Sequence, residues 1–252
     1  MREFEGFVFD LDNTAVSEGS LRVGSETLLH AFHSLDSSIP VMAATGRSLE
    51  FALPITSEFG LYHESIVANG AQIIESRSGM VLEENSLSLM QVDSIIKLVA
   101  TYDVDAHCCI AGDPMGSRYT AEEQIARSAP GVFVMDLDEL TATALASEVA
   151  KNNQMHAYIS SSVEGDRVLY DVNIGSSEAE KGKALLKLLS KKAINPMDMI
   201  VVGDSINDLS LFDVAGYRIA MADAHPTLLE RADEIIPSQK ENGLLEVVRR
   251  FI

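Results

Sequence analysis

Short apolar runs alternate with segments of helical periodicity towards both ends of the chain. The run Phe7–Phe9 is aromatic and β-branched and stops at acidic residues, which is typical of a strand buried on both faces. Similar runs predict strands at 39–44, 66–68, 199–202, 217–221 and 235–236. Apolar residues at helical spacing predict helices after the N-cap Ser25, from Ser48 with a bend or restart at Pro54, and over 183–193, 208–214 and 243–252. Strands that alternate with helices predict a parallel α/β sheet.

The middle of the chain has a different pattern. Apolar spacing predicts a helix around 95–99 and another through Leu140, Leu145 and Val149, and residues 107–111 read as a strand. Apolar and polar positions alternate from Val168 to Ile174, as in a half-exposed antiparallel strand. We therefore predict an α/β core formed by residues 1–78 and 172–252, divided by an inserted α+β module at 79–171.

Composition and charge narrow the classes of partner. The chain has 252 residues, of which 46% are hydrophobic and 23% charged, as expected for a folded protein with a substantial core. It has 38 acidic and 19 basic residues and a formal net charge of −19. So acidic a chain is repelled by nucleic acid and by anionic membranes, so we expect neither as a partner. A small anionic substrate remains possible, because a bound metal reverses the local sign of charge.

The cysteines and the N-terminal residues indicate a cellular location. Cys108 and Cys109 are adjacent and belong to no metal-binding or redox motif, which predicts reduced thiols in a cytoplasmic protein. Acidic residues interrupt the first apolar run before a signal-peptide pattern forms, and no apolar window approaches the roughly 18 residues of a membrane span. We expect a soluble, cytoplasmic monomer or weak homodimer.

Four polar segments carry the candidate chemistry, and we expect each to lie past the C-terminal end of a core strand, where open α/β sheets bind ligands. The first is Asp10-Leu11-Asp12-Asn13-Thr14. Two carboxylates two residues apart can serve one site, one as nucleophile or metal ligand and the other as proton donor. Taken alone, the segment is equally consistent with a polar turn that ends the strand.

The second and third segments are weaker. Thr45-Gly46-Arg47 offers a hydroxyl and a bare backbone near a helix start, which suits a phosphoryl oxygen, although an ordinary strand-to-helix turn explains it as well. Lys181-Gly182 opens a predicted helix, where the helix dipole disfavours a cation. A lysine that faces phosphate or paired carboxylates would resolve this conflict, and a solvated lysine is the simpler alternative.

The fourth segment, Gly203-Asp204-Ser205-Ile206-Asn207-Asp208, brings two carboxylates and an amide to the end of a buried strand. Hard oxygen ligands of this kind suit Mg²⁺, which accepts one or two carboxylates together with substrate phosphate. A turn rich in Asp and Asn is the alternative. The density of acidic residues favours the metal site.

In this order, the four segments resemble the motifs of the haloacid dehalogenase-like superfamily of phosphohydrolases. Their spacing and the Ala-Asn-Gly-Ala sequence at 68–71 resemble its Cof-type branch, which carries a type IIB (C2B) cap. Segments at 222–224, 226–232, 235–236 and 241–244 are similar too, so the resemblance covers both halves of the core, while the cap matches by architecture. The chain departs from the family pattern at Asn13 and Ala15, where Gly and Leu are common, and at Asp223, where Asn is usual.

The resemblance implies a Rossmann-like core and a mobile cap that closes over a phosphorylated substrate. It implies that Asp10 attacks phosphorus to form an aspartyl-phosphate, and that Asp12 protonates the leaving oxygen and then activates water. The implied phosphoryl-binding residues are Thr45, Gly46, Lys181 and Asn207. The implied Mg²⁺ site comprises Asp10, the Asp12 backbone carbonyl, Asp204 and Asp208, the last as a direct or an outer-shell ligand. Without a cation these carboxylates would repel one another.

The substrate is expected to be a small phosphorylated metabolite. Cof-type relatives commonly hydrolyse sugar phosphates, and phosphoglycolate is an alternative within the same chemistry. A mutase is less favoured. A catalytically silent sensor of a phosphorylated metabolite is the alternative from another class, and the intact Asp10, Asp12, Lys181 and Asp204 argue against it. Because all four segments lie outside the insert, we expect the insert to control substrate choice.

Overall fold

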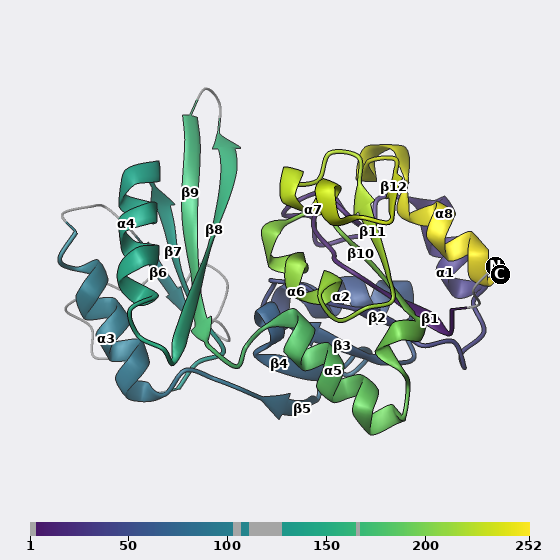
Figure 1. Cartoon of the computed structure of the whole chain (residues 1–252), viewed down its shortest axis with the longest axis horizontal. Coiled ribbons are helices and arrows are strands. Elements are labelled where there is room, and N and C mark those ends of the chain that lie inside the picture. The colour runs from purple at the N-terminus through teal and green to yellow at the C-terminus, as the bar shows by residue number, and fades with distance from the viewer. Residues whose placement is uncertain (1–3, 103–106, 111–127, 165–166) are drawn as a thin grey trace. The chain divides into compact units, whose positions relative to one another are not determined.

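A computed structural model describes residues 4–102, 107–110, 128–164 and 167–252 (Figure 1). The chain forms two compact units. Residues 1–83 together with 180–252 form one, called the core unit below, and residues 84–179 form the other, called the inserted unit. Each has its own cluster of buried apolar side chains.

The core unit is built on a five-stranded, entirely parallel sheet with strand order β12-β11-β10-β1-β2. Its strands are β1 (Gly6–Phe9), β2 (Val41–Ala43), β10 (Met199–Gly203), β11 (Tyr217–Met221) and β12 (Glu234–Ile236). Every residue of β1, β2 and β10 is buried, as the continuous apolar runs predict for strands covered on both faces. The parallel core sheet predicted from the sequence is therefore confirmed.

The predicted strand at 66–68 joins the fold differently from the expectation. It forms β3 (Glu64–Val67), which pairs with β4 (Gln72–Glu75) in antiparallel fashion, and β5 (Val81–Glu84) completes this three-stranded sheet. A single parallel bridge between Ala44 and Ile66 links β3 to the end of β2. The connection from β3 to β4 is only the short helical turn η1 (Ala68–Gly70), and a turn of this length can join only antiparallel strands.

Helices fill the connections of the core unit. They are α1 (Glu26–His33), α2 (Leu49–Phe59), α5 (Lys181–Lys192), α6 (Leu209–Phe212), α7 (Pro226–Arg231) and α8 (Leu244–Val248), with 3₁₀ turns η2 (Pro196–Asp198), η3 (Ile206–Asp208), η4 (Gln239–Glu241) and η5 (Arg249–Phe251). Ser25 caps α1 by accepting from the Leu28 N–H, as predicted. Helix α2 continues through Pro54 rather than restarting there, because residues on both sides of the proline are buried against the core.

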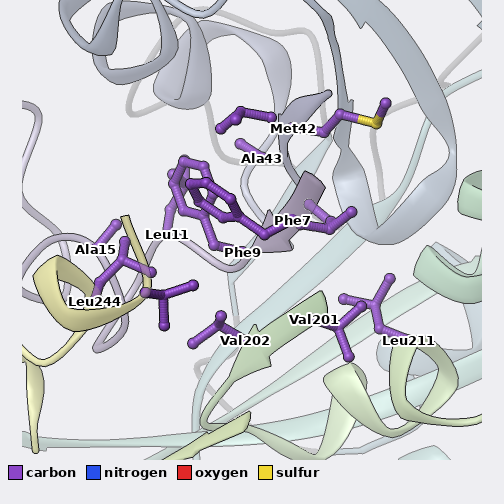
Figure 2. Close-up of a cluster of buried hydrophobic side chains, with 14 of the residues drawn as sticks. Phe7, Phe9, Leu11, Ala15, Met42, Ala43, Val201, Val202, Leu211 and Leu244 are labelled. Carbon is purple, nitrogen blue, oxygen red and sulfur yellow. The ribbon is translucent and has the colours of Figure 1, made fainter. Parts of the chain in front are cut away.

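The core of this unit is densely aromatic around β1. The rings of Phe7 and Phe9 lie against Phe32 of α1, and Phe9 also meets Phe59 of α2 edge-on, at centroid distances of 5.2 to 6.0 Å. Figure 2 shows Phe7 and Phe9 among aliphatic side chains from β2, β10 and α8. These contacts fix β1 between β10 and β2 in the sheet.

The inserted unit contains a four-stranded antiparallel sheet with strand order β6-β7-β9-β8. Its elements are α3 (Leu89–Val99), β6 (His107–Ile110), β7 (Val132–Leu137), α4 (Glu139–Val149), β8 (Met155–Glu164) and β9 (Arg167–Ser176). The sequence did not predict β7 and β8. In α4, Ala142, Leu145 and Val149 form the buried stripe, whereas Leu140 is 84% exposed, because it lies two residues from Ala142 and so on the other side of the helix.

Both predicted domain boundaries need correction. A cut at 78/79 would detach β5 from the three-stranded sheet of the core unit, and a cut at 171/172 would divide β9, which pairs with β8 along its whole length. The observed divisions fall after Glu83 and after Ala179. Cys108 and Cys109 lie in β6. The sequence also predicts a glycine-rich loop around 112–116 in the insert, with Met115, Arg118 and Tyr119, and this segment lies outside the described residues.

None of the helices in the described part of the chain combines the length and apolarity needed to cross a bilayer.

Candidate active site

Polar residues that follow β2, β1 and β10 lie side by side at the carboxyl edge of the parallel sheet. The Asp10 N–H donates to the Val202 carbonyl at 3.0 Å, and the Ala44 N–H donates to the Phe9 carbonyl at 2.9 Å. Because neighbouring parallel strands end at the same edge, these bonds place Asp10, Thr45 and Asp204 together. The Thr45 N–H also donates to the Ile66 carbonyl, so the end of β3 adjoins the same edge.

Lys181 joins two of the carboxylates at this edge. Its side chain is fully buried, and its Nζ donates to Asp10 Oδ1 at 2.9 Å and to Asp208 Oδ1 at 2.7 Å. Burial lowers the pKa of Lys181, but the charges of Asp10 and Asp208 outweigh burial and hold it above its usual value. These ion pairs also offset the unfavourable position of a cation at the start of α5.

The placement of Lys181 differs from the expectation in one respect. It does not follow a core strand: the strand before it in the chain is β9 of the inserted unit, and Lys181 is the first residue of α5. Helix α5 brings it to the sheet edge because Gly182 packs directly on α6, where its N–H donates to Ser210 Oγ at 3.1 Å. The lysine is therefore positioned by helix packing rather than by a strand end.

Asp10, Asp204 and Asp208 form an acidic cluster in which each offers one carboxylate oxygen, all within 4.8 Å of one another. Burial raises the pKa of Asp10 to about 7, with Lys181 acting against it and the neighbouring acids adding to it. Burial, followed by the charges of Asp10 and Asp208, raises the pKa of Asp204 to about 8. Three carboxylates share one lysine, so a divalent cation with oxygen ligands fits this donor set.

The acids of the fourth segment are held by hydrogen bonds. Thr14 Oγ1 donates to Asp204 Oδ1 at 3.0 Å. Asp208 Oδ2 accepts from the N–H groups of Asp204 and Ser205, both at 3.1 Å, while its Oδ1 accepts from Lys181. Both oxygens of Asp208 are thus already engaged, and this residue shapes the loop that presents Asp204.

The Asp12 carboxylate lies apart from this cluster, in a separate ion pair with Arg47. Arg47 Nε donates to Asp12 Oδ2 at 2.7 Å, and Nη2 donates to Oδ1. The Gly19 N–H adds a bond to Oδ1 at 3.1 Å, and Arg47 Nη1 is held by the Ser20 carbonyl. The two carboxylates of the first segment therefore have different cations, Lys181 for Asp10 and Arg47 for Asp12.

Thr45, Gly46 and Asn207 lie together on another side of the site. Thr45 is fully buried and its Oγ1 accepts from the Arg47 N–H at 3.1 Å, which leaves the hydroxyl hydrogen free to donate. A β-carbon built on Gly46 would lie 3.4 Å from Asn207 Nδ2 and 3.1 Å from Asn69 Oδ1. Asn207 Nδ2 donates to Asn69 Oδ1 at 2.8 Å.

Sequence reasoning gave no role to Thr14, Arg47 or Asn69, although all three contact predicted site residues. Thr14 and Arg47 belong to the recognised segments, but their partners lie 190 and 35 residues away in the chain, so local spacing could not reveal them. Asn69 lies in the Ala-Asn-Gly-Ala segment, which was noted only as a resemblance. Asp223 is exposed in the turn after β11 and is not part of the acidic cluster.

Comparison with known proteins identifies the class of protein. The family model described as haloacid dehalogenase-like hydrolase matches residues 7–129 and 115–248. Similar solved structures include a haloacid dehalogenase-like hydrolase from Bacillus subtilis (TM-score 0.80, 17% identity, 98% of this chain and 100% of that chain). Another, from Bacteroides thetaiotaomicron, has a TM-score of 0.77 at 19% identity and covers 99% of this chain and 100% of that chain.

The chain belongs to the haloacid dehalogenase-like hydrolase family. The predicted membership and the predicted fold class, an α/β core with an inserted α+β unit, are thereby confirmed. Curated relatives include a phosphoglycolate phosphatase from Methanothermobacter thermautotrophicus, 24% identical over 96% of both chains. Another is the 5-amino-6-(5-phospho-D-ribitylamino)uracil phosphatase YwtE from Bacillus subtilis, 38% identical over 48% of this chain and 39% of that protein.

Proposed function

We propose that this protein is a Mg²⁺-dependent phosphatase that hydrolyses a small phosphate monoester through an aspartyl-phosphate intermediate. The observation that carries the proposal is the buried arrangement of Lys181 between Asp10 and Asp208, next to Asp204, at the carboxyl edge of the sheet. Curated relatives that are named phosphatases support the reaction class. A protein that only bound a metabolite would not need a nucleophile and a cation in this geometry.

Asp10 is proposed as the nucleophile. One of its oxygens accepts from Lys181, which leaves the other to form a bond to phosphorus while the bond from phosphorus to the ester oxygen breaks. Lys181 and the Thr45 hydroxyl are proposed to hold phosphoryl oxygens, with Gly46 and Asn207 beside them. Fixed donors of this kind stabilise the charge that develops in phosphoryl transfer.

Asp12 is proposed as the general acid and base. It would protonate the departing ester oxygen and then remove a proton from the water that hydrolyses the aspartyl-phosphate. Both Asp12 oxygens accept from Arg47, so proton donation requires this ion pair to open.

The acidic cluster is proposed to hold the Mg²⁺ ion. Asp10, Asp204 and the backbone carbonyl of Asp12 would be its ligands, and Asp208, whose oxygens are already engaged, would support them from the outer shell. The bound ion would neutralise the carboxylates and the phosphate, and it would orient the phosphoryl group.

A sugar phosphate or a similar small ester is the proposed substrate, and phosphoglycolate is the second candidate, favoured by the relative that matches the chain over nearly its whole length. The inserted unit is proposed to select the leaving group, because Asp10, Asp12, Thr45, Lys181 and Asp204 all belong to the core unit. A panel of phosphorylated metabolites would rank these substrates.

Hydrolysis of p-nitrophenyl phosphate tests the reaction class. We expect turnover that requires Mg²⁺ and stops in EDTA, and full activity of the metal-free protein would contradict the metal assignment.

Asp10→Asn should lower turnover by several powers of ten, because an amide is a far poorer nucleophile. Asp12→Asn should still accept the phosphoryl group from this good leaving group, so borohydride should trap the intermediate at Asp10. Hydrolysis with inversion of configuration at phosphorus would indicate direct attack by water and would exclude the aspartyl-phosphate intermediate.

A further inference from the structure

The turn η1, Ala68–Gly70, has an unusual backbone. Its three residues all have positive φ angles, +49° at Ala68, +54° at Asn69 and +101° at Gly70, and all three are buried. Left-handed conformations are unfavourable in residues other than glycine and persist only where surrounding structure enforces them. Such strain concentrates at functional sites.

The contacts of the turn explain what enforces it. The Ala68 N–H donates to the Arg47 carbonyl at 2.6 Å, and the Asn69 N–H donates to the Thr45 carbonyl at 3.0 Å. A β-carbon on Gly70 would lie only 2.4 Å from the Glu180 backbone, immediately before Lys181. The turn thus adjoins the segments that carry Thr45 and Lys181, and the Asn69 side chain reaches Asn207.

The side-chain amides of Asn69 and Asn207 leave hydrogen-bonding groups unused. Asn69 Oδ1 accepts from Asn207 Nδ2, so Nδ2 is the end of the Asn69 amide that remains available for another hydrogen bond. The remaining Nδ2 lies 3.3 Å from the β-carbon position of Gly46, and neither it nor the Gly46 N–H has an acceptor among the described residues. Asn207 Oδ1 is buried with no partner in that same part of the structure. Asn207 Oδ1 is an acceptor and cannot bind a phosphoryl oxygen, so the group that this pair offers to a phosphate is the unpaired donor Asn69 Nδ2.

We propose that Asn69 is a substrate-binding residue whose Nδ2 donates a hydrogen bond to a phosphoryl oxygen, beside the N–H of Gly46. The proposal rests on the phosphatase function proposed above and adds a ligand that none of the four motif segments supplies. A neutral donor suits this place, because the site already contains an excess of carboxylates and further acidity would repel phosphate. The strained turn is then the means by which the chain brings this amide to the phosphate.

Two substitutions separate binding from mere support of Asn207. Asn69→Asp keeps an oxygen that accepts from Asn207 and tolerates positive φ, but it removes both donors and adds a negative charge. Asn69→Gly keeps the backbone conformation and removes the side chain. Asn242→Asp is the matched control, since Asn242 also has a positive φ, +59°, but is half-buried at the end of η4 and contacts no residue of the site.

The readouts are the inhibition constant of inorganic phosphate and the KM and kcat for p-nitrophenyl phosphate, with Mg²⁺ present. Because a hydrogen bond to a charged group contributes about 1.5–3 kcal/mol, we expect Asn69→Gly to weaken phosphate inhibition roughly 10- to 100-fold and Asn69→Asp to weaken it more. Asn242→Asp should match the wild type. Thermal unfolding of each variant reports whether the core is retained.

Other outcomes are equally informative. Wild-type values for Asn69→Asp together with a loss in Asn69→Gly would mean that Asn69 only orients Asn207, which overturns the proposal. Wild-type values for both variants would overturn it as well. If the unaltered protein neither hydrolyses p-nitrophenyl phosphate nor binds phosphate, the proposed function fails first, so the two failures are distinguishable.

Discussion

Lys181 and the three carboxylates around it show how a single buried residue organises the site. The lysine neutralises Asp10 and Asp208 at once, yet the pKa of Asp10 and that of Asp204 remain near 7 and 8 because burial dominates. In the protein without metal, these two groups therefore bind protons far more tightly than an exposed carboxyl does. That difference links stability, pH and metal binding.

The stabilising effect of Mg²⁺ should increase with pH. The carboxyl groups of Asp10 and Asp204 have pKa values near 4 in the unfolded chain but about 7 and about 8 in the folded protein. Between these values the folded state binds more protons than the unfolded state, so the metal-free protein loses stability as the pH rises from about 4 to about 8. Mg²⁺ needs deprotonated ligands and removes this penalty. We expect thermal unfolding to show a larger increase in Tm on adding Mg²⁺ at pH 8 than at pH 5. An equal increase at both values would contradict the assignment, and Asp204→Asn should abolish the difference.

Lys181→Met should destabilise the core strongly in EDTA. The change leaves Asp10 and Asp208 buried without their cation, and breaking a buried ion pair in this way costs about 3–5 kcal/mol. Urea unfolding at pH 7.5 measures the loss. Lys183→Met is the control, because the Lys183 side chain is 45% exposed and should change the free energy of unfolding by about 0.5 kcal/mol or less. A loss as small as that of the control would mean that the carboxylates are protonated.

At the scale of elements, the position of α5 decides whether the site exists. Lys181 is its first residue, and Gly182 fits against α6 so closely that a β-carbon there would lie 2.0 Å from the Ser210 carbonyl oxygen. Backbone groups cannot move aside as a flexible side chain can. Any side chain at position 182 must therefore displace α5 and carry the lysine away from Asp10.

Gly182→Ala should thus reduce activity and stability together. Overpacking of this kind costs about 1–3 kcal/mol, and the displaced lysine should lower kcat/KM for p-nitrophenyl phosphate at least tenfold. Gly24→Ala is the matched control, since a β-carbon at Gly24 meets nothing within 4 Å. Activity assays and urea unfolding of both variants test the prediction. An unchanged Gly182→Ala protein would show that α5 can shift without moving Lys181.

For the molecule as a whole, each of the two units has its own hydrophobic core. The carboxylates proposed to bind Mg²⁺ lie in the core unit only. Units with separate cores need not unfold in one step. A ligand stabilises only the unit that binds it. This separation gives a test of the domain organisation that does not depend on the substrate.

We expect calorimetry to resolve two unfolding transitions, of which Mg²⁺ with phosphate raises only one. Leu145→Ala, in the buried face of α4, should lower the other transition, because deleting a buried leucine costs about 2–5 kcal/mol. The ligand-sensitive transition should stay where it is in that variant. A single transition that moves under both changes would mean that the two units unfold cooperatively.

Much of the core unit is determined by the sequence itself. The runs at 7–9 and 199–202 are apolar throughout, and a strand covered on both faces requires that pattern, so they predict their own burial. An acidic residue marks the end of each of these two runs, Asp10 immediately after the first and Asp204 after Gly203. The strands β7 and β8 were missed, because they are stabilised largely by pairing with β9 rather than by a distinctive local pattern.

Only the tertiary structure decided which charges meet. The sequence places Asp10 and Asp12 two residues apart, but folding pairs the first with Lys181 and the second with Arg47, partners that lie 171 and 35 residues away. It likewise brings Asn69 to Asn207 across 138 residues and assigns β3 to a separate sheet. Local periodicity reports which side of an element is buried, whereas ion pairs and amide contacts depend on how distant elements pack. For this reason the sequence determined the candidate residues, and the packing of α5, η1 and the sheet edge determined their arrangement.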